Sequence, residues 1–169
     1  MTEEAMTEAE LKQHLDAAEK NPRQLAAATS GLPGETLRYK PAPDKWSILE
    51  ILGHLADVEI MFAHRIRQML AEEKSVIAPM NQNAWAANLA YMETPAPEMI
   101  ALFGVNRHHN LRILRRVKAQ DLKRSAYHPE LKRDVHLSEI VEKLDSHTQN
   151  HLRQIERLKR DAKNLPAIQ

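Results

Sequence analysis

The chain has 169 residues, of which 43% are apolar and 28% charged, the composition of an ordinary globular protein. A chain of this length can bury a substantial core, and we expect one domain over residues 1–169. The net charge of +1 gives no overall electrostatic reason to bind nucleic acid. The absence of cysteine excludes disulfides, thiolate metal ligands and a protein thiol nucleophile.

The first ten residues, MTEEAMTEAE, are acidic and do not have the basic and apolar regions of a signal peptide. No apolar run approaches the roughly 20 residues that span a bilayer. A chain without cysteine is also compatible with a reducing compartment. We therefore expect a cytoplasmic protein that has no membrane partner.

Apolar residues recur at helical spacing in four long segments. The first begins at Thr7, where Glu10 completes a capping box, and continues to about Thr29. Pro22 must either kink this segment or restart it as a new helix with Asn21 as its cap.

Three further long helices are expected along the chain. Ser47 and Glu50 form a second capping box, which starts a helix whose apolar stripe runs to Ile66. The other two helices are predicted at about 97–117 and 137–161.

Long connections separate these helices. Residues 30–46 are rich in glycine and proline, residues 75–97 hold one short helix at about 84–90, and residues 119–136 are expected to be irregular. The chain has only four glycines and few runs in which apolar and polar residues alternate, and both observations argue against a β-sheet. The sequence therefore predicts an all-α four-helix bundle with long crossover connections.

The clearest chemical pattern is the pair His147 and His151, four residues apart on the last predicted helix. Because the chain has nine histidines, about 0.4 such pairs are expected by chance, and the spacing alone is weak evidence. Both residues, however, continue the apolar stripe of this helix and so face the core. There they could bind a metal ion, or they could form hydrogen bonds to neighbouring helices.

His54 supplies a third inward-facing imidazole, because Ile51, Leu55 and Val58 flank it on the second long helix. Bundle cores build metal sites from side chains on facing helices. Three protein nitrogens with one position left open for water is the arrangement of a catalytic zinc site.

Three carboxylates lie near these histidines in the sequence. Glu50 and Asp57 are one turn before and one turn after His54, and Asp145 precedes His147. Each could accept a hydrogen bond that orients an imidazole. The commoner place for such residues is the exposed face of an amphipathic helix.

The segment 75–97 is expected to line a cavity above the metal with Trp85, Asn88 and Tyr91. Trp46 is assigned instead to packing at the start of the second long helix, because aromatic side chains dominate core burial.

A basic segment, RHHNLRILRRVKAQDLKR (107–124), carries seven Arg and Lys against Asp121 alone. Such a run is usually the solvated face of a helix. Arg107 or Arg112 could instead hold a substrate carboxylate. The same segment could contact nucleic acid, but its lack of interleaved aromatic residues and the near-zero net charge lead us to expect no such partner.

Two stretches, KPAPDKWSILEILGHLADVE (40–59) and HTQNHLRQI (147–155), resemble the DinB-like (YfiT-like) proteins. The pattern of that family is a Trp–Ser helix start leading to a His, and then a C-terminal His-x-x-x-His followed by Gln-Ile. Residues 127–151 are similar to the stretch that precedes the final helix in the family. The resemblance covers about residues 8–160.

The resemblance implies a four-helix bundle, often a homodimer, in which His54, His147 and His151 hold a divalent metal ion. Family members are often described as metal-dependent hydrolases, an activity that the description leaves provisional. Related proteins of the superfamily use the metal to activate a low-molecular-weight thiol such as bacillithiol or mycothiol. Residues 148–150, between the two histidines of the pair, include no acidic base.

These observations leave different functions open. A divalent ion on three neutral imidazoles can lower the pKa of a bound water from about 16 to about 7, or bind a thiol as thiolate. The chain would then be a hydrolase or a thiol transferase for a small molecule, with the thiol supplied as a cosubstrate. The alternative is a non-catalytic metal-binding protein of stress response or interaction. Zinc or nickel is the expected ion, although all-nitrogen ligation also suits copper and iron.

Overall fold

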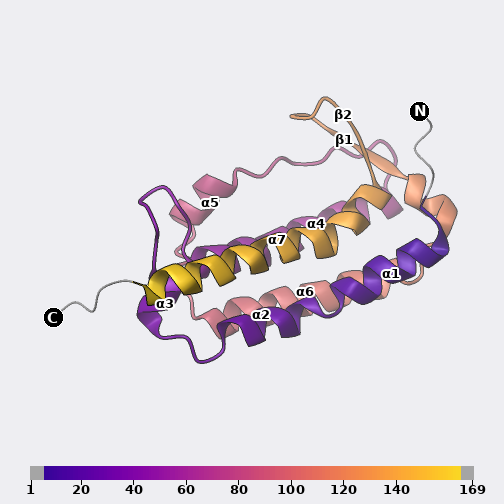
Figure 1. Cartoon of the computed structure of the whole chain (residues 1–169). Helices are drawn as coiled ribbons and strands as arrows, with labels where there is room; N and C mark the ends of the chain where they lie inside the picture. The colour runs from indigo at the N-terminus through magenta and orange to yellow at the C-terminus, as the bar shows by residue number, and fades with distance from the viewer. Residues whose placement is uncertain (1–5, 165–169) are drawn as a thin grey trace.

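The structure, a computed structural model that describes residues 6–164, confirms the predicted four-helix bundle (Figure 1). The limits of the expected domain, at residues 1 and 169, lie outside the described residues. Helices α1 and α2 together form one rod of the bundle, and α4, α6 and α7 form the other three. The long helices are α1 (Glu8–Ala18), α2 (Asn21–Thr29), α4 (Ile48–Ala71), α6 (Ala96–Leu114) and α7 (Leu137–Lys163).

Shorter elements connect the rods. They are α3 (Gly34–Arg38), α5 (Gln82–Asn88), the 3₁₀ helix η1 (Ala119–Lys123), and the strands β1 (Ser125–His128) and β2 (Arg133–His136). None of the helices in this described part of the chain is long and apolar enough to cross a membrane.

The four rods do not simply alternate in direction. Helices α4 and α6 are neighbours and run the same way, because the chain crosses back along the bundle between them through α5 (Figure 1). Glu59 of α4 bonds both Arg107 and Asn110 of α6, and Arg67, further along α4, also bonds Asn110. Helix α7 runs opposite to α4 and packs against both α4 and the α1–α2 rod.

Both predicted capping boxes are confirmed. The Thr7 hydroxyl accepts from the Glu10 amide, and the Glu10 carboxylate accepts from the Thr7 amide. Ser47 and Glu50 make the same two bonds at 3.2 and 2.7 Å, and this box starts α4 one turn before the first candidate metal ligand. These bonds satisfy amide groups that a helix leaves free at its N-terminus.

The break at Pro22 is a restart of the helix, with Lys20 as the N-cap of α2. The expectation that Asn21 caps α2 is wrong, because its side chain is buried and bonded to other parts of the bundle. Proline has no amide hydrogen, so the carbonyl of Ala18 has no donor four residues on. The guanidinium of Arg107 donates to that carbonyl at 3.0 Å instead.

The basic segment 107–124 is not wholly a solvated face, because its first residue, Arg107, is only 1% exposed. Its Nη2 donates to the equally buried carboxylate of Glu59 at 2.7 Å, to the Leu144 carbonyl at 2.8 Å and to the Thr148 hydroxyl at 3.2 Å. Together with Ala18 in the first rod, these partners link α6, which carries Arg107, to the other three rods. Arg107 is therefore an internal cross-link and not a substrate-binding group.

The connection 119–136 is more ordered than the sequence suggests. Strands β1 and β2 pair antiparallel, with Ser125 opposite His136 and His128 opposite Arg133. Tyr127 also exchanges hydrogen bonds with the segment after α4, donating to Ser75 and accepting from Ile77. The strands are only four residues long, too short to show a clear alternation of apolar and polar residues.

The apolar core has two parts along the bundle. One part surrounds the end where α4 begins and α7 ends, and it is the part next to the candidate metal ligands. Its buried members are Leu25, Ile48, Leu49, Ile51, Leu52, Leu55, Ala56, Ala86, Tyr91, Ala96, Met99, Phe103, Ile155 and Leu158. The other part fills the end that carries the hairpin.

Replacing Arg107 by alanine should lower the free energy of unfolding by about 3–5 kcal/mol, because Glu59 would remain as a buried, unpaired charge. Arg112→Ala is the matched control, since Arg112 is exposed on the same helix and should cost less than about 0.5 kcal/mol. Urea unfolding followed by circular dichroism measures both values. Equal losses in the two variants would contradict the internal cross-link.

A second prediction concerns the start of α7. The carboxylate of Glu139 accepts two bonds from Arg133, and these bonds, together with the His136 amide, hold the pKa of Glu139 at about 2 against the effect of burial. The lowered pKa means that this stabilisation is complete above about pH 4.5 and is lost as the pH falls toward 2. Because Arg133 is half exposed, Glu139→Gln should cost about 1 kcal/mol or less at pH 7. Thermal melts between pH 7 and 2 should show that the difference in melting temperature between Glu139→Gln and the unaltered chain vanishes at the acid end.

Candidate metal site

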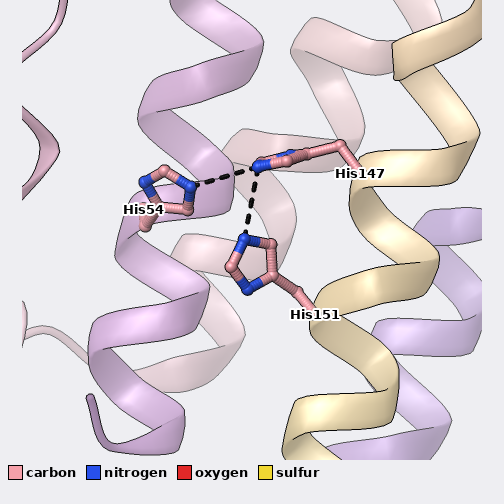
Figure 2. Close-up of side chains that lie close together, drawn as sticks. All are labelled: His54, His147 and His151. Carbon is pink, nitrogen blue, oxygen red and sulfur yellow. Dashed lines mark hydrogen bonds between the residues drawn. The ribbon is translucent and has the colours of Figure 1, made fainter. Parts of the chain in front are cut away.

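The three histidines singled out in the sequence meet in the bundle interior, at the end where α4 begins (Figure 2). His54 extends from α4, and His147 and His151 extend from successive turns of the facing helix α7. His54 is only 2% exposed, whereas the other two are half-buried. The structure therefore places the cluster at the edge of the core.

The three rings point their Nε2 atoms toward one another. Nε2 of His147 lies 3.3 Å from Nε2 of His54 and 3.2 Å from Nε2 of His151 (Figure 2). A ring nitrogen carries either one hydrogen or one in-plane lone pair. The Nε2 atom of His147 therefore cannot form full hydrogen bonds with both neighbours at once. Hydrogen bonding alone does not account for this convergence.

Burial keeps these rings neutral at physiological pH. It lowers the pKa of His54 to about 3 and that of His147 to about 4, and repulsion from the neighbouring imidazoles adds to both shifts. Burial also lowers the pKa of His151, although a hydrogen bond with Gln154 opposes the shift. Neutral imidazole is the form that binds a metal ion.

The arrangement fits a divalent metal ion. Metal–nitrogen distances of about 2.0–2.1 Å in a tetrahedral site require nitrogens about 3.3–3.4 Å apart, close to the two separations seen here. One donor atom from each of His54, His147 and His151 lies within 4.8 Å of the others. Three nitrogens fill three corners of a tetrahedron and leave the fourth for another ligand.

The three nearby carboxylates have partners other than the histidines. Glu50 bonds Ser47 and Lys40, and although burial opposes the shift, these bonds lower its pKa. Asp145 accepts from Asn21 and Gln149.

Asp57 accepts a hydrogen bond from the hydroxyl of Tyr91. Burial raises the pKa of Asp57, and the Tyr91 bond opposes the shift. The hydrogen bonds that the structure gives to the three carboxylates thus do not orient an imidazole.

Trp46 lies against the cluster. Its ring is tilted over His54, with the centroids 4.8 Å apart, and is nearly parallel to the ring of His151 at 6.3 Å. It also packs on the apolar core at this end of the bundle, as expected from the sequence. The spacing between residues 46 and 54 gave no sign of the contact with the imidazoles, because residue 46 precedes the helix.

The segment before α6 is anchored beside the site by Tyr91. The Tyr91 ring covers Gly53, the residue before His54, and a Cβ at position 53 would overlap that ring. The structure gives Trp85, Asn88 and Tyr91 three different environments, in contrast to the expectation that they line one cavity together. Tyr91 is buried, Trp85 is half-buried against the core, and Asn88 is exposed.

Comparison with known proteins agrees with this fold. The pattern of the DinB superfamily matches residues 17–155. A solved structure of YfiT from Bacillus subtilis, described as an unusual four-helix bundle, superposes with a TM-score of 0.88. It is 23% identical in sequence, and the match covers 96% of this chain and 93% of that one.

Curated relatives match over most of their length. The YfiT protein of Bacillus subtilis (strain 168) is 25% identical over 93% of this chain and 88% of its own. A protein of Bacillus pumilus is 27% identical over 92% and 88%. Both are named as metal-dependent hydrolases, an activity that their names leave provisional. The family match over residues 17–155 shows that this chain belongs to the DinB superfamily.

Proposed function

We propose that the chain binds one divalent metal ion through His54, His147 and His151, and that it is a metal-dependent enzyme acting on a small molecule. The observation that carries the proposal is the convergence of three neutral Nε2 atoms at a spacing that suits one ion. The names of the curated relatives support the metal dependence. Zinc and nickel are the ions that we expect.

The ion would supply Lewis acidity, which activates a water or a thiol at neutral pH. The chain's own residues provide the setting. Burial keeps the three imidazoles uncharged, and His147 and His151 are partly exposed, so that a small ligand could approach the cluster from their side. Trp46 closes one side of the cluster with an apolar surface, which limits the access of bulk water.

Two reactions remain within the proposal. Hydrolysis is the one that the relatives' names favour. Thiol transfer would need a low-molecular-weight thiol as a cosubstrate, because the chain has no cysteine. A non-catalytic metal-binding role in stress response or interaction is the alternative, and it predicts a bound ion without turnover.

Three further expectations stay predictions. The homodimer can be checked by sedimentation, the cytoplasmic location by fractionation, and the lack of a nucleic-acid partner by a binding assay at low salt. Salt-sensitive binding of a labelled duplex would contradict the last of these.

His147→Ala should abolish stoichiometric metal binding, because Nε2 of His147 is the donor that faces both other rings. His64→Ala is the matched control, since His64 is an exposed histidine on the same helix as His54. The measurement is elemental analysis of tag-free protein purified without a nickel column. One equivalent of metal surviving in His147→Ala would show that the site is wrongly assigned.

Hydrolysis and thiol transfer can be distinguished by whether turnover depends on added thiol. The metal-loaded protein should turn over activated esters without thiol if it is a hydrolase, and electrophiles only with added thiol if it is a transferase. A chelator should remove either activity, and the metal should restore it. Bound metal with no turnover in both screens would favour the non-catalytic alternative.

A further inference from the structure

The geometry of the cluster requires one particular tautomer of each ring. If the three Nε2 atoms are to donate lone pairs to one ion, the hydrogen of each neutral imidazole must lie on Nδ1. Free imidazole exchanges between the two tautomers. A protein that binds metal through Nε2 gains from a partner that accepts a hydrogen bond from Nδ1–H.

The structure supplies such a partner to His151. Nδ1 of His151 lies 3.1 Å from the side-chain oxygen Oε1 of Gln154, three residues further along α7. Residues at this spacing lie on the same side of a helix, so the bond is local and does not depend on another element. Both side chains are half-buried, which limits competition from water.

His54 is held in a different way. Its Nδ1 is buried and has no hydrogen-bond partner among the residues that the structure describes. The contacts of its ring are with Trp46, at 4.8 Å between centroids, and with the other two imidazoles. Packing therefore orients His54, and a hydrogen bond orients His151.

We propose that Gln154 is a positioning residue that holds His151 in the tautomer with hydrogen on Nδ1 and directs its Nε2 lone pair into the cluster. Its effect on metal affinity rests on the proposed metal site, whereas its effect on the tautomer does not. An amide oxygen is a neutral acceptor and withdraws the Nδ1 hydrogen less than a carboxylate would. The ligand is then less basic, and a bound ion keeps more of its Lewis acidity.

The tautomer can be tested without metal. In the metal-free protein labelled with ¹⁵N, long-range ¹H–¹⁵N spectra at neutral pH should show hydrogen on Nδ1 and a bare Nε2 for His151. Gln154→Met removes the acceptor at nearly equal size, and it should return His151 to a mixture of tautomers. A hydrogen on Nε2 in the unaltered protein would overturn the proposal, because Gln154 would then be a donor through its amide nitrogen.

Metal affinity provides the second readout. Gln154→Met should weaken metal binding by about 10–100-fold, the usual effect of removing a partner behind a ligand. Gln154→Glu supplies a stronger acceptor in the same place and should bind metal at least as tightly as the unaltered chain. Competition with a coloured chelator gives the dissociation constants, and thermal melts of the metal-free variants show whether each one folds.

Gln149→Met is the matched control. Gln149 lies on the same helix and is also half-buried, but its amide bonds Gln24 and Asp145. Metal affinity in this variant should be unchanged. Equal weakening in the Gln149 and Gln154 variants would contradict a specific role for Gln154. Failure of the unaltered protein to bind metal would refute the proposed function, and the tautomer spectra would still decide the role of Gln154.

Discussion

The burial of one ion pair, Arg107 with Glu59, constrains the whole bundle. A charge moved from water into a core is costly unless every donor finds an acceptor. Here both terminal nitrogens of Arg107, a residue of α6, find acceptors in the other three rods, including the Ala18 carbonyl that Pro22 leaves without a donor, whereas its buried Nε has no partner among the described residues. The helices can therefore slide or rotate only by breaking charged hydrogen bonds. Thr148, which also accepts from Arg107, lies directly after the candidate ligand His147, so the same network fixes the turn of α7 that carries the site.

The sequence predicts the bundle and the three converging histidines well, because both follow from periodicity. His54, His147 and His151 lie on apolar stripes, and facing stripes must meet in a bundle. The same rule could have identified Arg107, which is four residues after Phe103 and four before Leu111, both buried. Its charge and its basic neighbours predicted instead that the side chain is exposed to solvent. The sequence does not predict the β1–β2 hairpin, because its strands are short and pair through backbone groups that every residue carries.

The surroundings of the histidines were the hardest part to predict. Carboxylates one turn from a ligand are natural partners, yet the structure ties Glu50 to a helix cap and Asp57 to Tyr91. The bond of Glu50 to Ser47 follows from the capping box that the sequence predicts, whereas the bond of Asp57 depends on Tyr91, whose position only the folded chain reveals. The spacing of Gln154 from His151 also predicts a contact between them, although an amide is a less usual partner of a metal-binding histidine than a carboxylate is. The contacts of Trp46 and Asp57 are thus set by the tertiary structure, whereas the three histidines and the bond of Gln154 to His151 follow from helical spacing.

The parallel course of α4 and α6 has a consequence for how the chain folds. Neighbouring helices joined by a short loop can pair as soon as both have formed, but these two must wait for the long crossover between them to close. His54 and His147 are 93 residues apart in the sequence. Such distant partners raise the contact order, so this mostly helical chain should fold more slowly than an up-and-down bundle of equal length. The histidine cluster forms only when the last helix has docked, which ties assembly of the cluster to completion of the native topology.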